Sequence, residues 1–229
     1  MAKHFDLEEQ EQLDQLKHFW AKYGSPITWL LVLVLGAFAA WNGYQLWDRR
    51  QSAQASALYD EVERAAQSGD TALLERAAGD MREKFGRTTF ASQATLLEAR
   101  VLDEKSKSDA AIAALRWLTD NGADDGYKAV ARLRLAALLL ETKAYDDALK
   151  ALSAKVPASF ESLVADRKGD VYLAQGKREE ARTEFKRAHD QLEPGSELRQ
   201  LLEIKLNALG VDPMTLKGNA PAGATEKAK

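Results

Sequence analysis

The sequence predicts an all-α protein with an N-terminal tail helix, one transmembrane helix and then an α-solenoid of paired helices. A long apolar stretch near the N-terminus lacks charged residues, and helical periodicity broken by short turns fills the remainder. Two later segments also repeat each other at an offset of 33 residues. No stretch alternates apolar and polar residues with the period of two that a strand requires, so we expect no β-sheet.

The apolar stretch runs from Ile27 to Trp47, reads ITWLLVLVLGAFAAWNGYQLW, and lies in a region without charge between Lys22 and Asp48. About 20 mostly apolar residues cross the hydrocarbon core of a bilayer as a helix. We therefore predict a transmembrane helix over residues 23–48, with the lipid bilayer as its partner. Aromatic rings favour the headgroup level at both ends of such a helix. The expected membrane anchors are Trp29, Leu33, Trp41 and Trp47.

Three other interpretations of this stretch stay open. The first is the buried core helix of a soluble domain. The second is a cleavable signal peptide, because Ala37-Phe38-Ala39 has the A-x-A form that signal peptidase accepts. An acidic leader and continued apolar character past that site speak against cleavage. The third is pairing with another helix through Gly36 and Gly43, although their spacing of seven is not a G-x-x-x-G motif.

The tail before the span, residues 1–22, is short and acidic. Three apolar side chains of the tail and Tyr23, which follows it, recur at spacings of three, four and three. This spacing places them on one helix face: Leu13, Leu16, Trp20 and Tyr23. Such a face suits the membrane surface or a partner. A solvated acidic tail that becomes helical near the bilayer explains the pattern equally well.

The positive charges beside the span do not decide its orientation. Lysine and arginine gather on the cytoplasmic side of a membrane helix. Here Lys17 and Lys22 precede the span, whereas Arg49 and Arg50 follow it.

After the span the helical pattern continues, and helices then alternate with short turns. Ser68-Gly69-Asp70 makes the first break, and Asp70 or Thr71 is expected to cap the next helix. We predict helices at 51–67, 71–85, 89–106, 108–121, 126–142, 145–153, 160–174, 178–191 and 196–208. These make up a repeat domain over residues 49–212. Residues 213–229 are rich in small and charged residues, and we expect them to be disordered.

Two segments carry the internal repeat. LRLAALLLETKAYDDALKAL, from Leu133 to Leu152, superimposes on DRKGDVYLAQGKREEARTEF, from Asp166 to Phe185. The offset of 33 residues is close to the tetratricopeptide period of about 34. We therefore predict a tetratricopeptide-like solenoid, with a looser unit and a first pair at 51–85 before these two, and with the helix that begins after Ser196 as its cap.

The matching positions explain how such a repeat packs. A small residue such as Gly169 on the first helix lets the second helix approach closely. Ala181 lies in that contact, and the bulky Phe185 fills the gap to the next unit. The corresponding residues of the preceding unit are Ala136, Ala148 and Leu152.

The composition excludes several classes of function. The formal net charge is −3, so no nucleic acid partner is expected. The absence of cysteine excludes disulfides, thiol catalysis and cysteine-ligated zinc. Of the three histidines, only His189 follows the span, and we expect it to be solvated or to face the dipole at the end of its helix. No phosphate-loop, G-x-G-x-x-G, H-E-x-x-H or G-x-S-x-G motif occurs. We expect no enzyme, no catalytic residue, no metal and no cofactor.

Helical repeats bind segments of other proteins on a concave surface, which we expect the first helix of each pair to line. Arg132, Arg134 and Lys168 are the candidate partner-binding residues, because basic side chains there can hold a carboxylate. The alternative is that they are ordinary solvated positions. Trp117 is better explained as core or as a filler between repeats than as a binding platform.

Several stretches of the sequence resemble a known family. The tail ends EQLDQLKHFWAKYG, the span ends GYQLWDRRQ and leads into ASALYDEV, the last repeat reads VADRKGDVYLAQGKREEARTEF, and the closing helix carries LLEIKLNAL. With the overall layout, they resemble the YfgM-type ancillary subunit of the bacterial SecYEG translocon. The resemblance covers nearly the whole chain except its last dozen residues. Its most specific part is R-K-G-D-x-x-x-A-x-G-K-x-x-x-A-R.

The resemblance implies a single-pass type II protein of the cell inner membrane, with a cytoplasmic tail (1–22) and a periplasmic repeat domain. It implies association with the SecYEG translocon and with a PpiD-like periplasmic chaperone. Unfolded secretory client proteins would pass from one to the other, and no catalytic residue takes part. In some bacteria the family also restrains an envelope-stress regulator. The alternative function is a repeat scaffold for another cell-envelope assembly.

Overall fold

The computed structural model describes residues 7–212 of the chain and the side chains of residues 13–212. Every regular element in this part is a helix, which confirms the predicted all-α class. The chain divides into two compact units between Ala53 and Gln54. The first unit holds the tail and the span, and the second holds the repeats. The predicted disorder of residues 213–229 concerns a segment outside the described residues.

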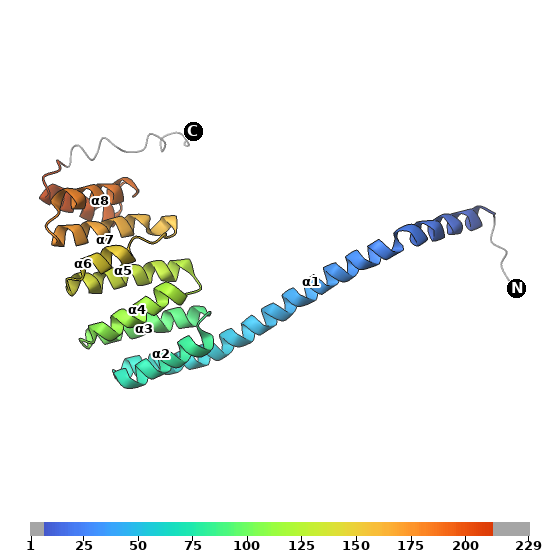
Figure 1. The fold of residues 1–229 in the computed structure, drawn as a ribbon, viewed down its shortest axis with the longest axis horizontal. Helices are drawn as coiled ribbons and strands as arrows, with labels where there is room; N and C mark the ends of the chain where they lie inside the picture. Colours follow the sequence, from blue (N-terminus) through green and yellow to red (C-terminus); the bar gives the residue numbers. More distant parts are fainter. Residues whose placement is uncertain (1–6, 213–229) are drawn as a thin grey trace. The chain divides into compact units, whose positions relative to one another are not determined.

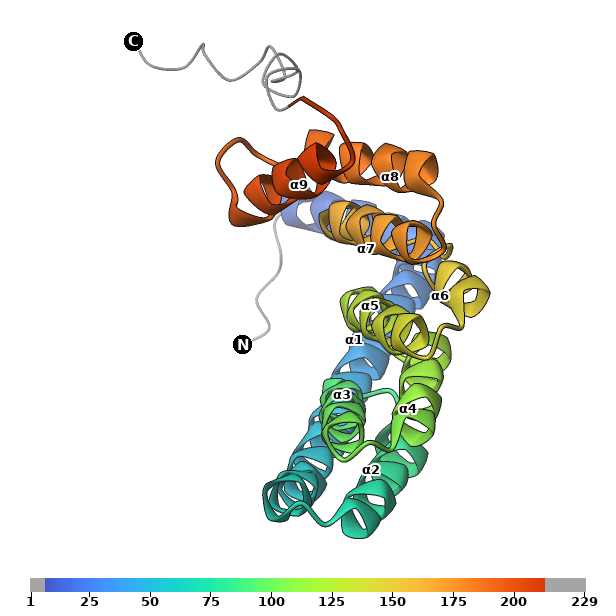
Figure 2. The same cartoon turned by 90° about the vertical axis from the view of Figure 1, so that its left-hand side faces the viewer.

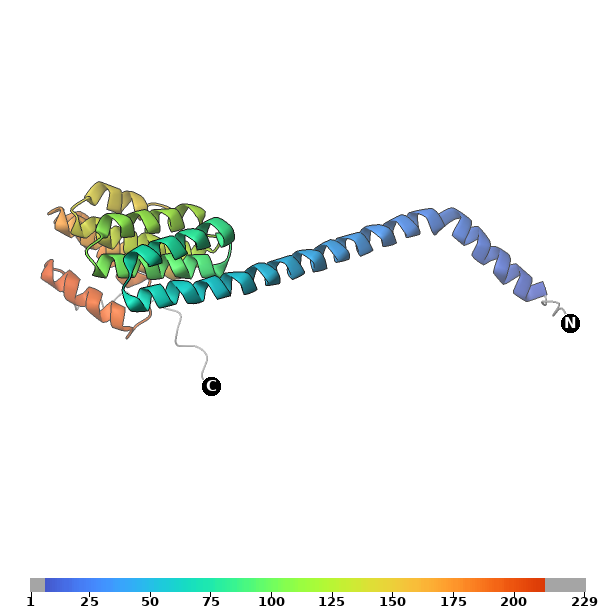
Figure 3. The same cartoon turned by 90° about the horizontal axis from the view of Figure 1, so that it is seen from below.

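The first helix, α1 (Leu7–Ser68), is 62 residues long and includes the tail, the span and the first helix of the repeats. Figure 3 shows α1 changing direction in its dark-blue N-terminal part. Pro26 lies inside the helix, and proline bends a helix because it lacks an N–H and clashes with the preceding turn. Next to it, Thr28 Oγ1 donates a 2.8 Å hydrogen bond to the carbonyl of Gly24.

The side chains of the apolar stretch are exposed. Only 6% of the most apolar 18-residue window of α1 is buried. Trp29 and Leu33 are 72% and 69% exposed. The core-helix interpretation is therefore wrong, since a core helix would be covered by other elements. By length and composition this helix can cross a membrane.

The second unit is a stack of helix pairs that follow one another in sequence order (Figure 1). Figure 2 shows α3, α5 and α7 in one row and α2, α4 and α6 in the other. The helices are α2 (Thr71–Phe85), α3 (Thr89–Glu104), α4 (Ser108–Asn121), α5 (Asp125–Glu141), α6 (Tyr145–Ala151), α7 (Glu161–Ala174), α8 (Arg178–Asp190) and α9 (Glu197–Ala208), with a 3₁₀ turn at Ala158–Phe160. The predicted helices agree with these bounds to within two residues.

Local sequence explains where these helices begin and end. Asp70 caps α2, because its Oδ1 accepts hydrogen bonds from the backbone N–H of Ala72 at 3.1 Å and of Leu73 at 3.0 Å. Ser196 occupies the N-cap position of α9, but its hydroxyl donates to the carbonyl of Glu193 at 3.1 Å and makes no cap bond. After α6 the chain leads into Pro157, which disfavours a helical conformation at the residue before it.

The predicted packing of the repeat is confirmed at Gly169. A Cβ added to this glycine of α7 would lie only 2.4 Å from Cε1 of Phe185 on α8. Phe185 is fully buried and belongs to an apolar cluster with Ala181, Leu202 and Leu206. The absent side chain is therefore what allows α7 and α8 to approach each other.

The last helix, α9, is held on the stack by charge as well as by apolar contact. The Nζ of Lys205 donates to Asp166 Oδ1 at 2.6 Å and to Asp170 Oδ1 at 2.7 Å, and both carboxylates lie on α7. The same ammonium lies 4.9 Å from the ring centroid of Phe185. α9 thus covers the end of the solenoid, as expected of a cap.

His189 differs from the expectation that it is solvated, because it is fully buried in the last turn of α8. Its Nδ1 lies 3.2 Å from Asp190 Oδ1, and its Nε2 accepts a 3.2 Å hydrogen bond from Arg199 Nε. Glu203 Oε1 lies 3.5 Å from Nε2. These partners, two of them on α9, satisfy both ring nitrogens, so burial leaves no polar group of the ring unpaired.

Candidate partner-binding surface

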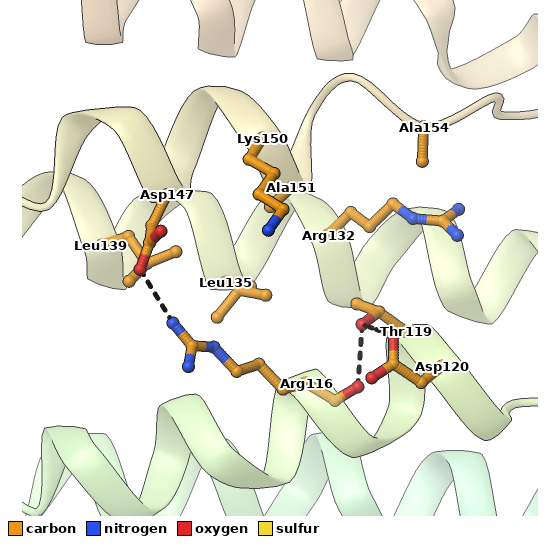
Figure 4. Close-up of a pocket in the computed structure, with 10 residues that line it drawn as sticks. All are labelled: Arg116, Thr119, Asp120, Arg132, Leu135, Leu139, Asp147, Lys150, Ala151 and Ala154. Atoms are coloured by element: carbon orange, nitrogen blue, oxygen red, sulfur yellow. Dashed lines mark hydrogen bonds and ion pairs between the residues drawn. The ribbon is translucent and has the colours of Figure 1, made fainter.

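A groove lies where α4, α5 and α6 meet, and Figure 4 shows its lining. It has a volume of about 460 Å³. Leu135 and Leu139 of α5 form an apolar floor, and Ala151 and Ala154 line the end of α6. α6 has only seven residues, whereas α4 has 14, so α6 leaves part of α5 uncovered. We call this surface the α4–α6 groove.

Three basic side chains surround that floor: Arg116, Arg132 and Lys150. Arg116 Nη2 forms a 3.0 Å ion pair with Asp147 Oδ2 across the groove, and both side chains are about half exposed, so the pair contributes little stability. Arg132 Nη1 donates a long 3.4 Å bond to the carbonyl of Lys155. Lys150 has no side-chain partner among the described residues. A cation free to bind therefore stands beside an apolar surface.

The three candidate residues predicted from sequence do not lie on one surface. Arg134 lines a separate groove of about 170 Å³ between α3 and α5 and donates a 3.2 Å bond to the carbonyl of Leu96. Arg132 and Arg134 are two residues apart, about 200° around a helix with 3.6 residues per turn, so they face different sides of α5. Lys168 on α7 is partly buried and lines neither groove.

Two members of the α4–α6 groove were missed from the sequence, namely Arg116 and Lys150. Both lie on the second helix of a pair, whereas the three residues predicted from sequence lie on first helices. The sequence does contain one indication of this groove. The helical segment around Tyr145–Ala151 is short, which predicts a gap in the row of second helices.

A third groove, of about 350 Å³, contains a buried ion pair between α2 and α3. Arg82 binds the carboxylate of Glu98, and its guanidinium lies 5.7 Å from the ring centroid of Trp117. Burial raises the pKa of Glu98, although the hydrogen bond and charge of Arg82 act to lower it. Trp117 packs against two of the apolar clusters, so this arrangement joins neighbouring repeats.

No group of three or more metal-ligating side chains occurs among the residues that the structure describes. The arrangement of the described surfaces, with shallow grooves of mixed charge and apolar floors, suits the binding of polypeptide segments.

Comparison with known proteins gives a consistent family. The tetratricopeptide repeat-like domain family matches residues 17–211. The chain is 34% identical over 213 residues to the ancillary SecYEG translocon subunit of Neisseria gonorrhoeae, covering 91% of this chain and 100% of that protein. It is 30% identical to the subunit of Haemophilus influenzae, over 90% of this chain and 99% of that protein. The Escherichia coli subunit is 26% identical, over 89% and 97%.

The match thus extends from the tail through the span to the end of α9, and it confirms the resemblance inferred from the residues. The family is a non-catalytic kind of protein. The chain belongs to the family of ancillary SecYEG translocon subunits.

Proposed function

We propose that this protein is a membrane-anchored adaptor of the SecYEG translocon that passes emerging secretory proteins to periplasmic chaperones. In this proposal α1 anchors the chain in the inner membrane with its N-terminus in the cytoplasm. The repeat domain stands in the periplasm, where it meets client proteins and a PpiD-like chaperone. Restraint of an envelope-stress regulator rests on the family resemblance alone and stays a prediction.

The observation that carries the proposal is the end-to-end match with ancillary translocon subunits, combined with an exposed apolar helix in this chain. A similarity confined to the repeats would support only a general binding module. Here the similarity includes the tail and the span as well. The anchor and the repeats therefore support one role beside the translocon.

Within that role, the α4–α6 groove is the proposed contact for a segment of the periplasmic chaperone. An apolar side chain of the segment would lie over Leu135 and Leu139. A carboxylate of the segment would meet Lys150 and Arg132, because charge-assisted hydrogen bonds to lysine and arginine are among the strongest available. Arg134 and Lys168 remain candidate contacts on other faces.

Orientation is tested with a periplasm-active reporter fused after Lys217 and, separately, ahead of Phe5. Activity from the C-terminal fusion alone is expected. Activity from the N-terminal fusion alone would place the repeats in the cytoplasm and would refute the hand-off of secretory proteins.

The partners are tested by copurification from solubilised membranes. Wild type is expected to recover translocon subunits and a periplasmic chaperone. The double substitution Arg132→Glu and Lys150→Glu is expected to reduce chaperone recovery while translocon recovery persists through the span. The double substitution Arg87→Glu and Lys186→Glu, at exposed positions outside the groove, is the matched control for two reversed charges. Unchanged recovery from the double variant would refute the groove, and absence of translocon subunits from wild type would refute the adaptor.

A further inference from the structure

The part of α1 before the bend has an apolar face that no described residue covers. Its members are the large side chains Leu13, Leu16, Phe19, Trp20 and Tyr23, which are 43–62% exposed. At about 100° per residue they occupy an arc of roughly 120° on the helix. The rings of Phe19 and Tyr23 contact each other, with centroids 5.1 Å apart. We call this the tail face.

The opposite side of the same helix is polar: Asp14, His18 and Lys22. Asp14 and Lys17 form an i,i+3 ion pair of 3.3 Å, which nearly neutralises the local charge. Lys22 Nζ lies 5.4 Å from the ring centroid of Tyr23. The helix is therefore amphipathic through apolar and aromatic surface, with little net charge to attract an anionic partner.

The junction with the span has the features of a membrane boundary. The indole of Trp20 lies against the backbone of Gly24, where a Cβ would come within 3.2 Å of the ring. Pro26 follows within the helix, and the apolar stretch begins at Ile27. A helix that enters the bilayer at this point holds the preceding turns at headgroup level, and Trp and Tyr favour that level.

We propose that residues 13–23 lie in the plane of the membrane surface, with the tail face in the boundary between headgroups and acyl chains of the bilayer that the span crosses. This inference rests on the proposed membrane anchorage. Continuity with the span selects lipid as the occupant, because lipid is present beside this face whenever the span is inserted. Helices with an apolar face of this kind and a polar opposite face bind membranes in this way.

The bend at Pro26 has a role in this arrangement. An in-plane helix and a spanning helix differ greatly in direction, so a chain that uses both must turn between them. Proline supplies that turn without breaking the helix, since its missing N–H and ring clash bend the preceding turn. The tail then acts as a second, surface-bound anchor that fixes how deeply the span sits.

The test uses the full chain reconstituted alone in phosphatidylcholine vesicles. Because the protein has no cysteine, single cysteines carry a spin label at one defined site. Leu13→Cys and Leu16→Cys probe the tail face, and Asp14→Cys and His18→Cys are controls on the opposite side. Gly36→Cys, where a Cβ meets nothing within 4 Å, reports insertion of the span. Collision with oxygen, which partitions into lipid, is compared with collision with a water-soluble nickel chelate present on both sides.

The tail-face labels are expected to show an oxygen-to-nickel collision ratio several-fold above that of the controls, because oxygen concentrates in lipid whereas the nickel chelate stays in water. Equal ratios at all four tail positions, with the Gly36 label in lipid, would refute the in-plane helix and leave the anchor intact. A Gly36 label exposed to nickel would refute the anchorage itself. Protection of the tail face only after purified translocon is added would show a protein partner and refute the lipid assignment.

Discussion

Replacing Gly169 by alanine is expected to destabilise the repeat domain, although alanine is the better helix former. The added Cβ would lie 2.4 Å from Cε1 and 2.5 Å from Cδ1 of Phe185. Carbon atoms in contact prefer about 3.5–4.0 Å, so the ring or α8 must move by about 1 Å. Phe185 is fully buried against α9, which leaves little space for that movement.

The magnitude follows from two opposing effects. Overpacking a well-packed core costs about 1–3 kcal/mol, whereas exchange of glycine for alanine inside a helix gains up to about 1 kcal/mol. Gly79 on α2 isolates the second effect, because a Cβ there would meet only Arg82 Nη2, at 3.9 Å. We expect Gly79→Ala to stabilise the domain. The unfolding free energy of Gly169→Ala should be about 1–3 kcal/mol lower than that of Gly79→Ala.

Urea unfolding of the two variants, followed by circular dichroism, measures this difference. A double variant with Gly169→Ala and Phe185→Leu is expected to recover part of the overpacking cost, as coupled neighbours do in a double-mutant cycle. Equal stabilisation by Gly169→Ala and Gly79→Ala would show that the close approach of α7 and α8 does not depend on the glycine.

Three further predictions concern other regions. Burial raises the pKa of Glu98 above its ordinary value, so the folded state binds this proton more tightly than the unfolded state does. The stability of wild type therefore falls as pH rises through the raised pKa. Urea titrations from pH 4 to 7 should show the unfolding free energy of Glu98→Gln increasing relative to that of wild type. Lys143 has a φ of +61°, and Lys143→Gly should raise the unfolding free energy by about 1 kcal/mol, as thermal melts would show. Leu33→Arg should make insertion of the span less favourable by about 2.5–3.5 kcal/mol, so less of this variant than of Leu33→Ala should resist carbonate extraction from membranes. An unchanged carbonate-resistant fraction would mean that the span is misplaced.

Much of the fold follows from local sequence, because helix periodicity and turn residues are local signals. The repeat could be recognised because the small Gly169 and the large Phe185 match a small and a large residue, Ala136 and Leu152, in the preceding unit. Their predicted contact is present because one packing rule applies to each unit of a solenoid.

The binding surfaces followed less well from sequence. Arg132 and Arg134 are near neighbours in the chain, but which face of α5 each occupies depends on where α3 and α6 pack. Burial of His189 depends on Arg199, which belongs to the next helix. Such partners lie on separate helices that only tertiary packing brings together, and they carry no periodic signal in the sequence.

The placement of α9 at the end of the stack has a consequence for quality control in the cell. Leu202 and Leu206 pack with Phe185, and Lys205 forms ion pairs with Asp166 and Asp170. A chain that ended at Gly195 would expose this apolar cluster and lose the Lys205 ion pairs, and local unfolding would spread inward because each unit is stabilised by its neighbours. Proteases remove open forms, so a pulse-chase should show a shorter half-life for that truncated chain. Completion of the last helix would then be the step that distinguishes a finished subunit from a fragment.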